Sequence, residues 1–327
     1  MHIVLNSFGA SLRKNSGLFE ISTQETKQMI NPAEVSSISV SKGARISSDA
    51  VLLAIEHEVD VMFVDNTGKP YGRVWSVKFG SISSIRRKQL EFFNSKNAVV
   101  WVKEIVIEKI NNQIALLLAI KQTTPELIQR KISATLKAME ELKRKVRENV
   151  GESVMEVSAS MRGWEGAASK KYFESLSFCL PDEYKFEKRS RQPAEDRFNA
   201  MLNYGYGMLY GKVEASLIKA GIDPYLGVFH RDDYNRPALV FDIIEKFRIW
   251  VDYIVYHLCL QRAMSDECFT VNNDMVLLDG LGKRILIQSV NDYLDEIISF
   301  GGIERSRAEH INVFTHRLAG LFMNFKN

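Results

Sequence analysis

The stretch RRKQLEFFNSKNAVVWVKEIVIEKINNQIALLLAIK, residues 86–121, determines the fold class of this 327-residue chain. It contains neither glycine nor proline, and it therefore predicts a long helix from Arg86 to Lys121, with a break near Asn111-Asn112 left open. Six of the 19 glycines lie in the first 80 residues, and the next glycine after Gly80 is Gly151. Helix is therefore expected to replace strand at about this point of the chain.

Upstream of this stretch, the sequence predicts strands separated by turns. Runs of β-branched and aromatic residues alternate with turn residues such as Gly9, Gly17 and Gly43. Ser47 begins a group of N-cap residues, so one short amphipathic helix is expected to run to about Glu58. The four expected strands are His2–Leu5, Leu18–Ile21, Val35–Val40 and Val59–Val64.

These patterns predict an α+β protein with two domains. The first, residues 1–78, is expected to be a small, sandwich-like β domain with one short helix. The second, residues 84–327, is expected to be a larger all-α domain, because the chain stays rich in helical patterns beyond Gly151.

Composition excludes several classes of protein. The chain is 46% hydrophobic and 25% charged, which is typical of folded globular proteins rather than disordered ones. Its net charge of +3 is too small to indicate a nucleic-acid or membrane partner by itself. Three cysteines without a C-x-x-C motif favour reduced thiols and a cytoplasmic location. No signal peptide and no membrane-spanning segment is expected, because no apolar run approaches about 18 residues.

Two carboxylates at helical spacing form the first candidate site. The stretch Gly221–His230 leads through a polar loop to Leu239–Arg248, in which Asp242 and Glu245 share one helix face. At about 6 Å in an effective dielectric near 20, two such charges repel by roughly 3 kcal/mol, so a positive group is expected beside them. That group could be a divalent cation or simply Arg248, and spacing alone leaves both open.

A second acidic residue, Glu165, lies among small residues in Arg162-Gly163-Trp164-Glu165-Gly166-Ala167-Ala168. Such residues allow close approach to the backbone by another helix or by a ligand, and tight helix packing is the favoured interpretation. The segment from Gly205 to Gly211 is likewise interpreted as a helix contact, because it lacks the strand and the spacing of a dinucleotide-binding loop.

Basic residues gather in three segments. Residues 121–150 carry eight lysines and arginines against four glutamates, and Arg86-Arg87-Lys88 and Lys185–Arg191 form two smaller groups. Together with an acidic cluster able to hold a cation, they favour a polyanion substrate. ATP-driven chemistry has no support, since the chain has no G-x-x-x-x-G-K-[ST] motif.

Four segments in order carry a family resemblance: residues 162–173, 189–206, 221–230 and 241–248. They resemble the motifs of the CRISPR-associated endonuclease and integrase of the spacer-acquisition module. The resemblance implies a metal-dependent DNA endonuclease and integrase that inserts short duplex DNA into a CRISPR array by attack of a 3′-hydroxyl on a phosphodiester. It implies Mn²⁺ or Mg²⁺ as the cofactor, with Glu165, His230 and Glu245 as metal ligands and Asp242 as an accessory catalytic carboxylate.

The same resemblance implies partners. It implies double-stranded DNA held by Tyr172, Lys188, Arg189, Arg191 and Arg248, a homodimer formed through the β domain, and a complex with the small second CRISPR-associated protein. Two alternatives stay open: a nuclease that cuts branched repair intermediates without a partner, and a non-catalytic DNA-binding scaffold whose acidic cluster pairs with Arg248.

Overall fold

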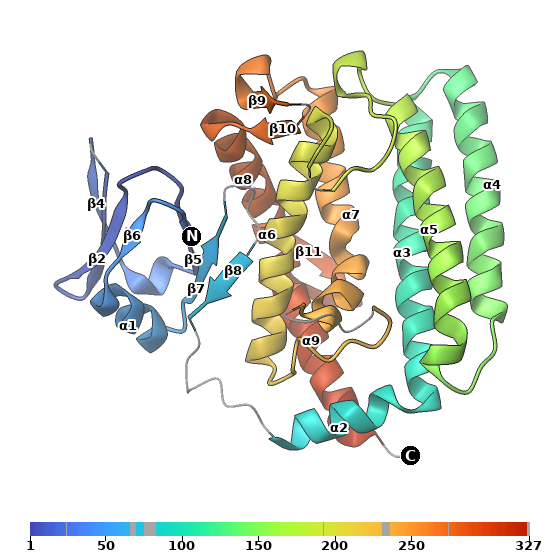
Figure 1. The fold of residues 1–327 in the computed structure, drawn as a ribbon, viewed down its shortest axis with the longest axis horizontal. Helices are drawn as coiled ribbons and strands as arrows, with labels where there is room; N and C mark the ends of the chain where they lie inside the picture. The colour runs from blue at the N-terminus through green and yellow to red at the C-terminus, as the bar shows by residue number, and fades with distance from the viewer. Residues whose placement is uncertain are drawn as a thin grey trace. The chain divides into compact units, whose positions relative to one another are not determined.

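The computed structural model divides the chain into two compact units, Met1–Gly80 and Ser81–Asn327 (Figure 1). The first is built mainly of strands and the second mainly of helices, so the predicted α+β class is confirmed. The structure describes residues 1–23, 25–65, 70–74, 83–191, 193–230, 236–273 and 275–325.

Two four-stranded sheets enclose the core of the first unit. Leu12 and Phe19 from one sheet pack into the same buried cluster as Ile38 and Val61 from the other, which gives the sandwich-like arrangement that the sequence predicts. In the first sheet the order is β1 (His2–Leu5), β5 (Ser37–Ser41), β7 (Asp60–Val64) and β8 (Pro70–Arg73). In the second it is β4 (Lys27–Ile30), β3 (Leu18–Ser22), β2 (Ser11–Asn15) and β6 (Arg45–Ile46).

Strands β2 and β4 have no counterpart among the predicted strands. Each buries only one side chain, Leu12 in β2 and Ile30 in β4, and its other residues are exposed or partly exposed. Without an alternating apolar pattern, neither segment carries the sequence signal of a half-buried strand. The short helix agrees with the prediction: α1 (Ser48–Glu56) begins after Ser47, whose hydroxyl accepts a hydrogen bond from the Ala50 amide at 3.2 Å.

Long helices form most of the second unit (Figure 1). Helix α3 packs against α4, α5 and α7, and α7 packs in turn against α6, so α3 and α7 lie at the centre of the helical packing. No described helix has both the length and the apolar character needed to cross a membrane. The helices are α2 (Ser83–Phe93), α3 (Lys96–Thr123), α4 (Glu126–Glu148), α5 (Val154–Phe178), α6 (Arg197–Lys219), α7 (Ala238–Leu260), α8 (Gly280–Asp295) and α9 (Arg307–Asn324).

The long predicted helix does break, but not at Asn111-Asn112. It breaks at Asn94-Ser95. The side-chain amide of Asn94 donates to the Leu90 carbonyl, and the Ser95 hydroxyl donates to the Phe92 carbonyl. These side chains satisfy carbonyls at the end of α2, which ends the helix. Asn111 and Asn112 instead bond to Lys143 and Lys246 of neighbouring helices, and α3 continues through them.

The second unit is not entirely helical, contrary to the expectation from the sequence. Two antiparallel hairpins interrupt it, and their short strands leave most side chains exposed or partly exposed. Four-residue strands of this kind give too short a pattern to be recognised inside a helix-rich sequence. They are β9 (Phe269–Asn272) with β10 (Met275–Leu278), and β11 (Ile297–Phe300) with β12 (Ile303–Ser306).

Helices α6 and α7 meet closely at Gly205, as the sequence predicts. A Cβ atom on Gly205 would lie 2.5 Å from Cγ1 of Val251, well inside van der Waals contact. Because valine is stiff about χ1, neither side chain could turn aside easily.

Substituting Gly205→Ala is therefore expected to lower the free energy of unfolding by about 1–3 kcal/mol, through overpacking. Gly320→Ala in α9 is the matched control, because its added Cβ would have no neighbour within 4 Å. The control should gain roughly 0.5–1 kcal/mol from helix propensity. Urea unfolding measures both, and a Gly205→Ala protein as stable as its parent would contradict the close contact.

Candidate active site

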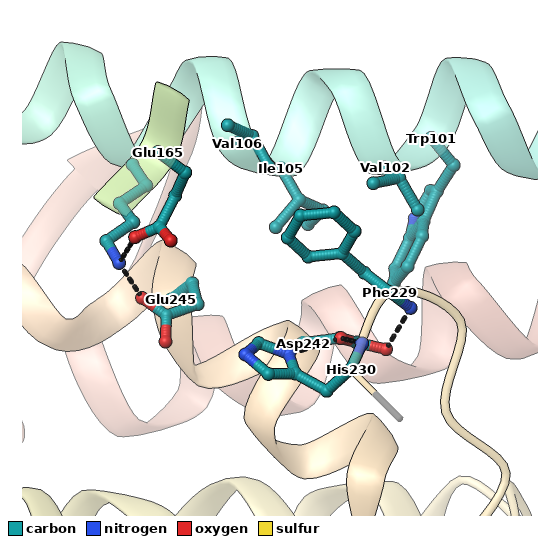
Figure 2. A pocket seen from close by; sticks show the side chains of 10 residues that line it. Trp101, Val102, Ile105, Val106, Glu165, Phe229, His230, Asp242 and Glu245 are labelled. Atoms are coloured by element: carbon teal, nitrogen blue, oxygen red, sulfur yellow. Dashed lines mark hydrogen bonds and ion pairs between the residues drawn. The ribbon is translucent and has the colours of Figure 1, made fainter. Parts of the chain in front are cut away.

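Three central helices each contribute a charged side chain to one cluster. Lys109 of α3 forms ion pairs with Glu165 of α5 and with Glu245 of α7, the latter with 2.5 Å between Nζ and Oε2. Lys109 lies on the same helix face as Ile105 and Val106, four and three residues earlier, and both are buried. Figure 2 shows the side chains of Glu165 and Glu245 extending from different helices into the same end of a pocket.

The cluster is largely removed from solvent. The side chains of Lys109 and Glu245 are each 12% exposed and that of Glu165 is 21% exposed. Burial by itself would lower the pKa of the Lys109 ammonium, but Glu245 and Glu165 outweigh it and the pKa is raised. Burial would likewise raise the pKa of Glu245, but Arg248 and Lys109 lower it to about 2. Lys109 and Glu245 are therefore both charged at neutral pH.

Arg248 supplies a second positive charge. Its Nε donates to Oε1 of Glu245 at 2.8 Å, and its guanidinium lies 4.4 Å from the centre of the Tyr206 ring. This is the pairing that the sequence left open. Sequence reasoning missed Lys109, for which the available signal was a lysine within the apolar pattern of residues 101–120.

His230 and Asp242 form a second pair in the same pocket. Asp242 is 1% exposed, and its Oδ1 lies 2.7 Å from the His230 Nδ1 atom. The same carboxylate accepts hydrogen bonds from the backbone amides of Val228, Phe229 and His230, at 2.7, 3.1 and 2.9 Å. At the start of this loop, Gln89 of α2 bonds to both backbone groups of Asp223. The segment from Asp223 to His230 is thus held at both of its ends.

This geometry changes the role expected for Asp242. A carboxylate has about four acceptor positions, and four hydrogen bonds already use them. Asp242 therefore orients the histidine ring and the loop, rather than offering a free oxygen to a ligand or a reacting atom. Since Nδ1 faces Asp242, the Nε2 atom is the nitrogen left to coordinate.

The pocket brings the four predicted residues together without forming a finished metal centre. Among the described residues, no group of three His, Cys, Asp or Glu side chains is arranged to hold a metal ion. Glu165, His230, Asp242 and Glu245 nevertheless line one cavity, and His230 is close enough to Glu245 to lower its pKa. Figure 2 shows the histidine ring directed to the side on which Glu245 lies.

Two observations show that these residues fit a divalent cation. Among the described residues, the buried Oε2 atom of Glu245 has only the Lys109 ammonium as a partner, at 2.5 Å. Glu165 and Glu245 already converge on one cationic group. Carboxylate oxygens with an imidazole nitrogen are a donor set that suits Mn²⁺ or Mg²⁺.

A larger cleft of about 390 Å³ opens beside the cluster. Lys109, Glu165 and Glu245 line it together with Gly166, whose missing Cβ has no neighbour within 4 Å. Gly163 is equally open, so neither glycine lies at a tight helix contact, whereas Ala168 is fully buried. The small residue at position 166 instead borders the cleft. Basic residues that also line it are Lys170, Lys188, Arg189, Arg191 and Arg248.

The predicted DNA-binding residues divide into exposed and internal ones. Lys188 and Arg191 are exposed on the cleft, whereas Arg189 is half-buried and bonds to Asn199 and Asn203. Tyr172 was predicted wrongly: it is fully buried, and its hydroxyl donates to Asp252 at 2.9 Å. Its place between two basic segments in the sequence gave no indication of burial.

Some basic side chains of the other segments form ion pairs with neighbours. In α4, Arg144 pairs with Glu141 and Glu148, and Arg130 pairs with Glu126. In α2, Lys88 pairs with Glu91. Lys188 and Lys170 of the cleft are paired as well, with Glu195 and Glu174, so the cleft is distinguished by its position beside the acidic cluster.

Comparison with known proteins agrees with the motifs. The family described as CRISPR associated protein Cas1 matches residues 3–292. A CRISPR-associated endonuclease Cas1 of Archaeoglobus fulgidus is 32% identical over 317 residues, which cover 92% of this chain and 90% of the relative.

Two solved structures share the fold at lower identity. A casposase bound to integration product has a TM-score of 0.85 and 23% identity, covering 100% of this chain and 91% of its own. A chain of a Cas6-RT-Cas1–Cas2 complex has a TM-score of 0.82 and 22% identity, covering 99% of this chain and 35% of its own. With the family match over most of its length, the chain belongs to the Cas1 family of CRISPR-associated proteins.

Proposed function

We propose that this Cas1 protein is a divalent-metal-dependent DNA integrase and endonuclease. It joins the 3′-hydroxyl ends of short duplex DNA to phosphodiesters of a CRISPR array by transesterification. Glu165, His230 and Glu245 would hold Mn²⁺ or Mg²⁺, and Asp242 would orient His230. The observation that carries the proposal is the convergence of Glu165 and Glu245 on one cationic group at the border of a basic cleft.

The residues of the pocket suit this chemistry. A bound dication polarises a phosphate oxygen and stabilises the charge that develops on the leaving oxygen. Asp242 holds the His230 ring in one orientation and fixes the tautomer with the proton on Nδ1. Trp101, Val102 and Phe229 line the apolar side of the pocket. Lys188 and Arg191 lie where a phosphate backbone would pass along the cleft.

The proposal includes partners and location. The casposase neighbour is bound to an integration product and another neighbour is part of a complex with Cas2, which supports duplex DNA and the small second CRISPR-associated protein as partners. Two joining events at a fixed separation require two active sites, so a homodimer formed through the β domain belongs to the same proposal. The three free cysteines agree with a cytoplasmic location.

One alternative gains support from a specific contact. The Glu245–Arg248 ion pair is the pairing expected of a non-catalytic DNA-binding scaffold. Intact DNA binding, together with no stabilisation by Mn²⁺, would favour that scaffold. Robust cutting of branched DNA by the protein alone, with no joining, would instead favour a partner-independent nuclease that uses the same site.

DNA joining should depend on the proposed metal ligands. Purified protein, its small partner, Mn²⁺ and a short duplex with 3′-hydroxyl ends should give covalent insertion into a plasmid that carries repeats. Glu165→Gln and His230→Ala should each lower the rate of joining by at least about a hundredfold, because a metal ligand is removed. Glu126→Gln, on an exposed part of α4, is the control and should join normally. Wild-type rates with either ligand variant would contradict the assignment.

DNA binding should depend on the basic residues of the cleft. The double variant Lys188→Ala and Arg191→Ala should weaken binding and reduce the slope of log K against log salt by about 0.9 for each phosphate that is no longer neutralised. Lys137→Ala with Lys145→Ala removes the same charge from exposed positions of α4. Fluorescence anisotropy, measured over a range of salt concentrations, compares them. An equal effect of both double variants would argue against the cleft as the DNA site.

Metal affinity should depend on Asp242 through the histidine. Asp242→Asn keeps the shape of the side chain but replaces an acceptor oxygen with a donor that faces backbone amides. The free energy of unfolding should fall by about 1–3 kcal/mol, and Mn²⁺ affinity should fall by about 10–100-fold as the histidine loses its orientation. Calorimetry measures both quantities, with the exposed Asp266→Asn as control. Unchanged affinity would show that Asp242 does not position the ligand.

A further inference from the structure

Lys109 occupies the place where the two acidic side chains meet. Its ammonium pairs with both Glu165 and Glu245, and its side chain is only 12% exposed. A buried ammonium without partners is strongly disfavoured, so this position depends on the two carboxylates. The carboxylates in turn depend on it, since Glu165 otherwise has only the Ser169 hydroxyl as a described partner, at 3.0 Å.

The cavity that contains all three proposed metal ligands has little room for a second cation. The cavity that Glu165, His230 and Glu245 share measures about 10 Å³, which is the room needed for roughly one water. Mg²⁺ usually keeps several waters when it binds a protein. A hydrated dication and the Lys109 ammonium therefore cannot both occupy this cavity.

We propose that Lys109 is an internal counter-ion that competes with the divalent cation for Glu165 and Glu245. In the absence of metal it balances, together with Arg248, the charge of the two carboxylates, and it holds α3, α5 and α7 together. Metal binding releases its side chain toward the adjoining cleft, which Lys109 also lines. The affinity of the site for metal is thereby set by a residue that is not a ligand. This inference rests on the proposed metal site.

A neighbouring ion pair provides a matched comparison. Lys246 of α7 pairs with Glu108 of α3. Lys246 directly follows Glu245 in the sequence and Glu108 directly precedes Lys109, so the two ion pairs are neighbours. Its side chain is 13% exposed, close to the value for Lys109. The described residues that line the two cavities include neither Lys246 nor Glu108. Removing either lysine breaks an ion pair between α3 and α7, but only the loss of Lys109 should change the affinity of the site for Mn²⁺.

The test is calorimetric titration of Mn²⁺ into the full-length wild type, Lys109→Met and Lys246→Met. Lys109→Met should bind Mn²⁺ at least about tenfold more tightly, because a competing charge within a few ångströms is gone. It should also melt at a lower temperature in EDTA and gain more from added Mn²⁺ than the wild type does. Lys246→Met should melt lower but bind Mn²⁺ with unchanged affinity.

A measurement on the wild type alone covers the case in which Lys109→Met does not fold. Reductive methylation followed by mass spectrometry reports how accessible each lysine ammonium is. Mn²⁺ should increase the labelling of Lys109 and leave that of Lys246 unchanged. Labelling of Lys109 that does not change when Mn²⁺ binds would overturn the proposal.

The outcomes separate the inference from the proposed function. If Lys109→Met binds Mn²⁺ as tightly as the wild type or more weakly, the proposed competition by Lys109 is wrong, but the proposed metal site is retained. If neither binds Mn²⁺, both the metal site and the competition are wrong.

Discussion

The ion pairs that Lys109 forms with Glu165 and Glu245 are the interaction that organises the site. They join α3, α5 and α7 at one point, and together with Arg248 they keep the buried Glu245 carboxylate ionised. Loss of one partner from a buried pair of this kind typically costs about 3–5 kcal/mol, because the remaining charge is left without compensation. Whatever binds these carboxylates must therefore supply at least the charge that Lys109 supplies.

The rest of the pocket is built to hold His230 beside this acidic pair. Asp242 belongs to the same helix as Glu245, and its four hydrogen bonds fix the loop that carries the histidine. Because Asp242 is three residues before Glu245, both are positioned by the packing of α7 against α3 and α6. A buried carboxylate that holds the ligand side chain in one orientation places the catalytic group precisely.

Local signals in the sequence predicted the features that depend on local order. The N-cap at Ser47, the close helix contact at Gly205 and the acidic and histidine motifs all have short, specific patterns. Features that depend on tertiary partners were missed or misplaced. Lys109 is a single lysine whose role requires two distant helices. Helix α3 continues through Asn111 and Asn112 because these side chains bond to other helices. The burial of Tyr172 was not predicted, because no pattern in the sequence indicates that Asp252 lies beside it and accepts its hydrogen bond.

Anomalous diffraction from crystals grown with Mn²⁺ would show whether the metal takes the place of Lys109 between the two carboxylates. We expect one strong anomalous peak in contact with Glu165, Glu245 and Nε2 of His230, with Asp242 still bonded to Nδ1 and the Lys109 side chain moved toward the cleft. A fully loaded crystal in which Lys109 still bridges the two carboxylates, or in which the metal lies on other side chains, would contradict both the metal site and the exchange.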